Sequence, residues 1–358
     1  MNNISSASLP MLNVPIQTSR FNTIPCYPRF QWLNNPKVVE VLGRFLKSSE
    51  RGRKGYDKVL MFRWLIWKQL VGCSFRDLEG ISGGIDYSTF IKFRKRLIET
   101  LWFPRIFKQL TAWVLSQTNS LFLLLDSSFV ESYSKRKEKG AEYSGYKKKT
   151  GFKLHQVIDF DTRLPLSQTA TGGARSDITV AKNLIRGAPR YKDKKVRALS
   201  ADKGYDGIDF VLQIKKKWKG IKIAIPQRRT NQSALDSKKR ETELNRQLKS
   251  AERCLNQELL NKRTEIERYF SRLKRVFNLG EERTRHLKNF RANYYLVSIA
   301  VILEWLSKNP LFKLLFTKLI RIMSGQMSKY WFSHKREIIG ETQKISFFQR
   351  TILPICFQ

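Results

Sequence analysis

The sequence has few acidic residues for the number of basic ones. Its 30 aspartates and glutamates stand against 68 lysines and arginines, which gives a formal net charge of +38 at pH 7. Such an imbalance informs about partners rather than fold, and nucleic acid is the commonest polyanionic partner. A ribosomal-type or non-specifically adhesive protein would carry a similar charge. Because 41% of the residues are hydrophobic and 12% are aromatic, a disordered basic tail is excluded.

Cysteine and histidine are also scarce, and this argues against two kinds of site. The four cysteines are too far apart for a zinc spacing or a disulfide framework: Cys26, Cys73, Cys254 and Cys356. Only His155, His286 and His334 could join them as ligands. A Cys/His metal site and a secreted disulfide scaffold are therefore not expected.

Long hydrophobic runs are missing as well. The first residues lack a basic segment followed by an apolar one, so a secretory signal is not indicated. The longest apolar run, residues 294–306, contains Glu304 and is too short to span a bilayer. We therefore expect a soluble protein of a reducing compartment, cytoplasmic and associated with the nucleoid, with no membrane partner.

The first third of the chain reads as helical after a polar arm. Residues 1–36 have scattered prolines and no sustained period, which predicts an arm. From 37 to 118 the pattern is helical, with helices expected at 59–71, 74–82 and 87–97 and with Ser74 as an N-cap. The last two resemble a helix-turn-helix arrangement, whose basic second helix would carry Lys92, Arg94, Lys95 and Arg96. From this segment alone, a plain helical bundle is the simpler interpretation.

From 119 to 307 the pattern alternates between strands and helices. Strands are expected at 120–126, 151–160, 163–171, 195–202 and 221–226, with the second and third forming a hairpin. Helices are expected at 176–187 and 208–218, and a long helix follows in the stretch KRTEIERYFSRLKR, residues 262–275. Alternation of this kind predicts an α/β domain.

Helical geometry separates the two glutamates of that last stretch. With Ile266 set at zero, Phe270, Leu273 and Phe277 fall within about 40° and form a buried stripe. Glu267 falls at about +100°, on the same flank as Arg263 and Lys274. Glu265 falls at about −100°, where it is most simply a surface partner of Arg268 or Arg272. Glu267 therefore suits a metal ligand at the edge of the core, although a helix pair between Glu267 and Arg263 explains the spacing too.

Two aspartates complete a candidate site. Asp126 ends the first expected strand and Asp202 the fourth, and sites form at strand ends in open sheets. Carboxylates that meet there repel one another unless a hard cation lies between them, and Mg²⁺ prefers oxygen ligands. A pair of such ions can activate a hydroxyl group and stabilise the leaving oxygen of a phosphodiester.

The order of these motifs resembles that of a known family. LLLDSSFV carries Asp126, SADKGYDG carries Asp202, and RTEIERYFSRLK presents Arg263, Glu267 and Lys274 as Arg-x₃-Glu-x₆-Lys. The segments KTGFKLH, which contains Lys153, and TGGARSD also look like family segments. Over roughly residues 40–307 the chain is similar to DDE-type transposases of bacterial insertion sequences.

The resemblance implies a fold, an activity and a set of site residues. The fold would be a ribonuclease-H-like mixed sheet flanked by helices, preceded by a helical DNA-binding domain. Asp126, Asp202 and Glu267 would hold Mg²⁺ or Mn²⁺, and Arg263, Lys274 and Lys153 would contact DNA. The protein would cleave element ends and join them to target DNA, acting as a homodimer or higher assembly.

Several features leave other readings open. The family often has a tyrosine three residues before the arginine, where this chain has Leu260, so a stacking contact there is in doubt. His155 is expected to be a satisfied strand residue and Asp177 a helix cap. The polar segment 228–253 is either an insertion near bound DNA or a solvated charge run. The basic, apolar tail 308–358 is either a DNA-contacting or dimerising extension or a read-through without function.

Two other functions therefore compete with the transposase. A decayed copy would be a DNA-binding repressor that has lost catalysis, and the unusual tail favours this reading. A metal-dependent, structure-specific nuclease would use the same carboxylates without joining strands.

Overall fold

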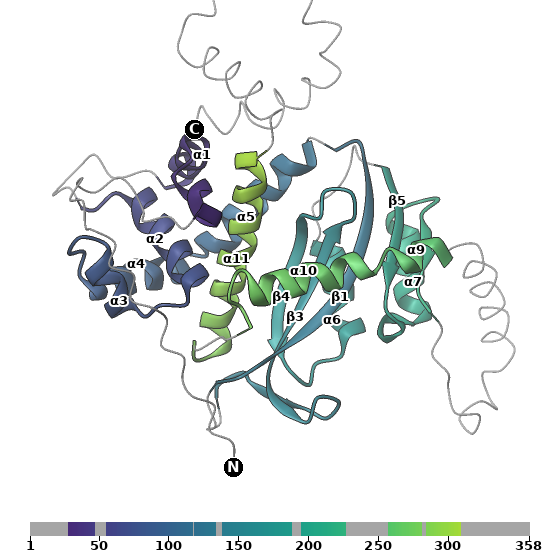
Figure 1. Cartoon of the computed structure of the whole chain (residues 1–358). Coiled ribbons are helices and arrows are strands. Elements are labelled where there is room, and N and C mark those ends of the chain that lie inside the picture. The colour runs from purple at the N-terminus through teal and green to yellow at the C-terminus, as the bar shows by residue number, and fades with distance from the viewer. Residues whose placement is uncertain are drawn as a thin grey trace, which may run out of the picture.

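A mixed β-sheet forms the centre of the region that follows the N-terminal helices (Figure 1). The computed structural model describes residues 28–46, 55–116, 118–133, 138–187, 195–226, 257–280 and 284–308. The expected arm up to residue 27, the insertion near 228–253 and the tail from residue 309 lie outside these ranges. The strands are β1 Ser120–Glu131, β2 Glu142–Ser144, β3 Lys149–Asp159, β4 Pro165–Gly172, β5 Lys195–Ala201 and β6 Lys222–Ala224.

The strand order combines an antiparallel half with a parallel half. β3 pairs antiparallel with β1, β2 and β4, whereas β5 pairs parallel with β1 and β6. The order across the sheet is β2-β3-β1-β5-β6, with β4 also on β3. Helices connect β4 to β5 and β5 to β6, as parallel crossovers require. This is the ribonuclease-H-like arrangement expected from the sequence, and β2 is the strand that the sequence did not reveal.

Helices cover both faces of the sheet. They are η1 Pro28–Asn34 and η2 Lys203–Tyr205, which are 3₁₀ helices, and α1 Pro36–Phe45, α2 Lys58–Val71, α3 Phe75–Ile81, α4 Tyr87–Glu99, α5 Trp102–Ser116, α6 Asp177–Gly187, α7 Ile208–Lys217, α9 Gln257–Asn261, α10 Thr264–Arg275 and α11 Leu287–Lys308. Leu121, Leu123 and Leu125 of β1 pack with α6 and α7, whereas Phe122 and Leu124 pack with α10 and α11. Alternation along β1 therefore defines two faces, which we call the α6 face and the α10 face.

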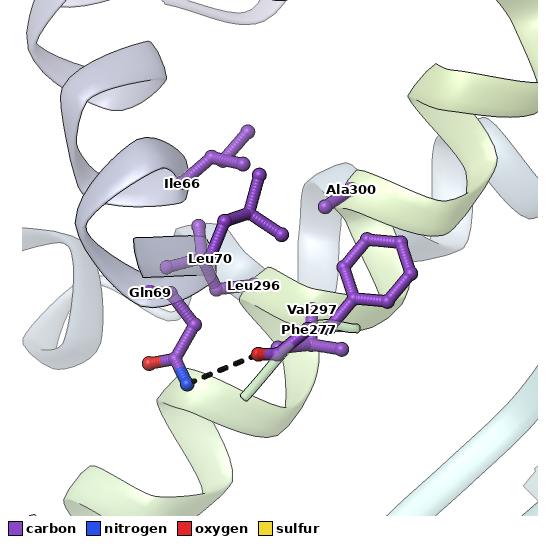
Figure 2. Close-up of a pocket in the computed structure, with 7 residues that line it drawn as sticks. All are labelled: Ile66, Gln69, Leu70, Phe277, Leu296, Val297 and Ala300. Atoms are coloured by element: carbon purple, nitrogen blue, oxygen red, sulfur yellow. Dashed lines mark hydrogen bonds between the residues drawn. The ribbon is translucent and has the colours of Figure 1, made fainter. Parts of the chain in front are cut away.

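The helices near the N-terminus share one core with the α10 face of the sheet. Their apolar residues and those of α10 and α11 belong to the same buried cluster, which also includes Phe30 and Leu33 of η1. Gln69 of α2 donates hydrogen bonds to the carbonyl oxygens of Phe277 (3.5 Å) and Asn278 (3.3 Å). These bonds lie beside an apolar pocket that α2, α11 and the end of α10 line together (Figure 2). The 28–36 portion of the expected arm is thus packed structure, with α1 beginning at Pro36.

The predicted helix signals of this region are present. Ser74 caps α3, and its hydroxyl group and the carboxylate of Asp77 form a reciprocal capping box. Gly83 and Gly84 separate α3 from α4 with positive φ angles of 76° and 92°. Among the described residues, no helix is both long and apolar enough to cross a membrane.

Candidate active site

Asp126 lies on β1, and Asp202 directly follows the neighbouring parallel strand β5. The register places Leu125 of β1 opposite Ala201, the last residue of β5, so each aspartate is the next residue after this pair. By alternation from Leu124, Asp126 lies on the α10 face. The negative charge of Asp202 contributes to raising the pKa of Asp126, as expected for carboxylates placed close together.

Asp126 does not end its strand, and this part of the sequence prediction is wrong. β1 continues to Glu131, because β3 pairs with it from Leu123 to Glu131. What ends near Asp126 is the pairing with β5. The site therefore lies where the parallel half of the sheet stops and the antiparallel half continues.

Arg263 links Asp126 to Glu267. Its guanidinium nitrogens lie 3.6 Å from Asp126 Oδ2 and 2.9 Å from Glu267 Oε1. Arg263 is the residue immediately before α10, a helix that crosses the sheet in front of β1 (Figure 1). The helix pair weighed in the sequence is thus present, and the same arginine also brings the glutamate to the first aspartate.

The environment of Asp126 disfavours its ionised form. The pKa of Asp126 is raised to about 7, chiefly by burial and to a smaller extent by the charges of Asp202 and Glu267, while the Ser127 amide and Arg263 oppose the shift. The side chain of Asp126 is 15% exposed, whereas that of Glu267 is 52% exposed. One half-buried carboxylate and one exposed carboxylate therefore share Arg263 as counter-charge.

The residues have the chemistry of a hard-cation site. All three carboxylates offer oxygen ligands, and a divalent cation would offset both the burial of Asp126 and the smaller repulsion from Asp202 and Glu267 that raise its pKa. Within the described ranges no group of three acidic, histidine or cysteine side chains is gathered closely enough to hold a metal. The guanidinium of Arg263 supplies the counter-charge in this structure.

Glu265 is buried, which contradicts the expected surface position. It is 9% exposed and forms ion pairs with Arg163, at 3.0 Å, and with Arg268. The predicted stripe is buried, but Tyr269 is buried too, so the apolar face of α10 extends towards the flank of Glu265. Of its two expected partners, Arg268 is found, while Arg272 instead pairs with Glu304 at 2.6 Å.

Glu265→Gln is expected to lower stability and to leave chemistry within a few-fold of the wild type. Loss of the charge weakens two ion pairs at a nearly buried position, which costs about 1 kcal/mol because both arginines are largely exposed. Thermal unfolding and DNA cleavage by the same preparation would measure both effects. If the Glu265→Gln protein were inactive but normally stable, Glu265 rather than Glu267 would belong to the site.

Lys274 is anchored to the sheet about two helical turns beyond Glu267. Its ammonium group donates a hydrogen bond to the carbonyl oxygen of Phe129 at 2.8 Å. Burial lowers the pKa of Lys274, and the nearby charge of Lys147 lowers it further. Lys274 therefore places a positive charge beside the continuing part of β1.

Lys153, His155 and Asp177 form a separate cluster on the α6 face. Lys153 Nζ lies 3.2 Å from Asp177 Oδ1 and donates to the carbonyl oxygen of Arg175 at 3.0 Å. Burial lowers the pKa of His155 to about 4, so the ring is neutral at pH 7, and its Nε2 is bonded to Thr171 Oγ1 at 2.9 Å. Lys153 is thus held on the face opposite to Asp126, and Asp177 begins α6 rather than joining the three carboxylates.

The four basic residues of α4 do not share one environment. Arg94 donates to the carbonyl oxygen of Asn289 at 3.1 Å and to Asn293 Oδ1 at 2.8 Å, so it fastens α4 to α11. Lys95 lies 3.9 Å from Glu99 in an exposed helix pair. Lys92 and Arg96 are exposed. The structure thus gives Arg94 a packing role and leaves the other three on the surface.

Two buried residues near the aspartates, Tyr205 and Gln156, were not identified from the sequence. Burial raises the pKa of Tyr205 well above its usual value, and the charges of Asp126, Asp177 and Asp202 raise it further. Gln156 pairs with Asp126 in the β1–β3 register, and its amide donates to the carbonyl oxygen of Ser167 at 3.0 Å. Tyr205 follows Asp202 within SADKGYDG, so that motif was the available signal; for Gln156 only the strand register could have shown it.

The fold is therefore that of a ribonuclease-H-like domain in which Arg263 contacts Asp126 and Glu267, and Asp202 follows the end of the neighbouring strand. A family model described as "Transposase DDE domain" matches residues 118–303, just over half of the chain. The chain belongs to this transposase DDE domain family.

A comparison with solved structures found a likeness to a cryo-EM structure of a piggyBac transposase synaptic complex with hairpin DNA. The identity is 13% and the TM-score 0.32, and the likeness covers 57% of this chain and 51% of that one. The chain thus matches about half the length of that protein. No curated protein matches the sequence.

Proposed function

We propose that this protein is a DNA transposase of a bacterial insertion sequence. It cuts DNA at the ends of its own element and joins those ends to target DNA. The observation that carries the proposal is the contact of Arg263 with both Asp126 and Glu267, beside Asp202 on the next strand. Membership of the transposase family supports the same conclusion.

The reaction would be phosphoryl transfer at a DNA phosphodiester. A water oxygen, or in joining a DNA 3′-hydroxyl oxygen, forms a new bond to phosphorus, and the bond to the leaving oxygen breaks. Asp126, Asp202 and Glu267 would hold Mg²⁺ or Mn²⁺, which when bound activates the attacking oxygen and stabilises the leaving one. Arg263 and Lys274 would position DNA phosphates, because positioning and charge are the protein's main contributions to this chemistry.

Cutting and joining together separate this proposal from its rivals. The full chain, with Mg²⁺ or Mn²⁺, would be incubated with DNA from either side of its coding region and with a target plasmid. A transposase cuts and joins, a nuclease cuts without joining, and an inactive repressor binds without cutting. Short inverted repeats in the flanking DNA would support the transposase independently. Joining requires two ends, so the proposal includes a homodimer or higher assembly on DNA.

We assign recognition of the ends to α4, and the exposure of Lys92, Lys95 and Arg96 supports this assignment. The double variant Lys92→Gln, Arg96→Gln is expected to reduce the preference for end DNA over scrambled DNA by about 10-fold or more, since each lost base contact costs about 1–3 kcal/mol. Binding titrations with the full chain would measure it, because the N-terminal helices share their core with α11.

A matched pair on α5 provides the control for α4. Arg105 and Lys108 are exposed too, so Arg105→Gln, Lys108→Gln removes the same charge from a neighbouring helix. Equal loss of preference in both double variants would show that α4 does not read the ends.

A further inference from the structure

The β2–β3 hairpin carries an exposed group of tyrosines and lysines. β2 and β3 pair from Glu142 opposite Gly151 to Ser144 opposite Lys149, and residues 145–148 form the turn. Tyr143 is 59% exposed and Tyr146 is 90% exposed, and Lys147 Nζ lies 5.0 Å from the centre of the Tyr146 ring. Lys148 and Lys149 are exposed beside them. We call Tyr143 and residues 146–149 the hairpin tip.

Glycines of two sequence motifs fix the base of this hairpin. A Cβ atom on Gly172 would lie 2.2 Å from the Glu142 carboxyl carbon, and one on Gly173 would lie 2.7 Å from the Glu142 carbonyl oxygen. A Cβ on Gly151 would lie 2.2 Å from the carbonyl oxygen of Val130. The glycines of KTG and TGG therefore allow β2 to pack directly on the sheet, so the tip projects from a rigid base.

The turn contains a lysine in an unfavourable backbone conformation. Lys148 has a φ of 51°, in the left-handed region that glycine or asparagine adopts more readily. Unfavourable backbone conformations of this kind cluster at binding sites, so a contact made by the Lys148 side chain explains this position better than the fold of the turn does.

The lysines of the hairpin tip extend the positive charge that Lys274 places beside β1. Lys274 lies against Phe129 of β1, and the charge of Lys147 reaches it. Gly151 pairs with Glu131, which is five residues beyond Asp126 on β1, or about 17 Å at about 3.3 Å per residue. Lys149, where the turn begins, lies two residues further along β3, so the tip is about 23 Å from Asp126, the rise of about seven base pairs of DNA.

We propose that the hairpin tip is a second DNA-contact site, which binds the strand about seven nucleotides from the cut. Lys147 and Lys148 neutralise phosphates there, and the Tyr146 ring lies against a base or sugar, because aromatic residues among lysines suit the faces of nucleotides. The inference rests on the proposed function, in which Arg263 and Lys274 position DNA phosphates beside the same strand, β1.

The salt dependence of binding tests the lysines. Lys147→Gln, Lys148→Gln in the full chain is expected to reduce the slope of log affinity against log salt by about 2, since each phosphate contact contributes about 0.9. The control Lys216→Gln, Lys219→Gln removes two exposed charges from the region of α7. Equal slopes in the two double variants would overturn the proposal, because a general electrostatic field would then explain them.

Photocrosslinking tests the location. With a photoreactive phenylalanine in place of Tyr146, adducts are expected about seven nucleotides from the cut in DNA that flanks the coding region. Adducts spread evenly along the DNA, or none, would overturn the assignment. Lys148→Gly should weaken binding without lowering the melting temperature; a lower melting temperature would give Lys148 a structural role instead.

Experiments with the same DNA distinguish failure of the hairpin inference from failure of the proposed function. If the wild-type chain cuts and joins flanking DNA while the hairpin variants bind like their control, only the hairpin inference fails. If the wild type binds but never cuts or joins, the proposed function fails, and the salt slopes still report on the hairpin.

Discussion

Asp126→Asn, Asp202→Asn and Glu267→Gln are each expected to slow DNA cleavage by about a thousandfold or more. Each variant keeps the size of the side chain but removes the negative charge that would hold the cation, and lost transition-state stabilisation of this kind costs at least a few kcal/mol. Affinity for flanking DNA should stay within a few-fold of the wild type, because none of the three carboxylates would contact DNA directly. Single-turnover cleavage and a binding titration with the same DNA would measure both.

Removal of the metal should reproduce the effect of these variants. Chelation is expected to stop cleavage by the wild type, and Mn²⁺ to restore it. Glu265→Gln is the matched control, because it removes the same charge from the same helix at a residue that forms ion pairs with Arg163 and Arg268. A variant of the three that still cuts at the normal rate would remove its residue from the site.

The order of helices and strands was predictable because each element has its own hydrophobic period and is bounded by turn residues. The hairpin of β3 and β4 and the helices α6 and α7 lie where hydrophobic period and turn residues place them. Register was not predictable, because it depends on which strands pair. For this reason Asp126 was read as a strand end, although β1 continues for the length of β3.

Helical geometry gave directions around α10 but not its neighbours. The angle of Glu267 correctly placed it on the flank of Arg263, and the structure adds the contact of that arginine with Asp126. The same reasoning misplaced Glu265, because it did not include Tyr269 in the buried face or the approach of Arg163 from the β3–β4 turn. Long-range partners of this kind leave no periodic signal in the sequence.

Arg94 and Glu142 show the same limit. Arg94 belongs to a run of basic residues, yet it bonds to Asn289 and Asn293, nearly 200 positions later. Glu142 lies in a polar segment with no strand pattern, yet its side chain fills the space left by Gly172. In both cases a residue far away in the sequence determines whether the charged side chain is exposed or supports the fold.

Arg263→Gln is expected to raise the affinity of the DNA-free protein for Mn²⁺ by about tenfold, a coupling of about 1.4 kcal/mol. In the structure the guanidinium lies between Asp126 and Glu267, at 3.6 Å and 2.9 Å, and supplies the counter-charge that a metal would supply. Removing it leaves the carboxylates repelling one another, which favours another cation. Titration of the full chain with Mn²⁺, followed by electron paramagnetic resonance, measures the affinity directly and without catalysis.

The same variant should break the link between DNA and metal. In the wild type, a DNA phosphate that draws Arg263 towards itself frees the two carboxylates, so flanking DNA should tighten Mn²⁺ binding, and by reciprocity Mn²⁺ should tighten DNA binding. In Arg263→Gln that mutual effect should be largely lost, and joining should be impaired more than end recognition. Arg268→Gln is the control, because it removes the same charge from the next turn of the helix at a residue paired with Glu265. If both variants bind Mn²⁺ equally well, or if DNA tightens Mn²⁺ binding as much in Arg263→Gln as in the wild type, then Arg263 is only a helix partner of Glu267 and does not control access to the site.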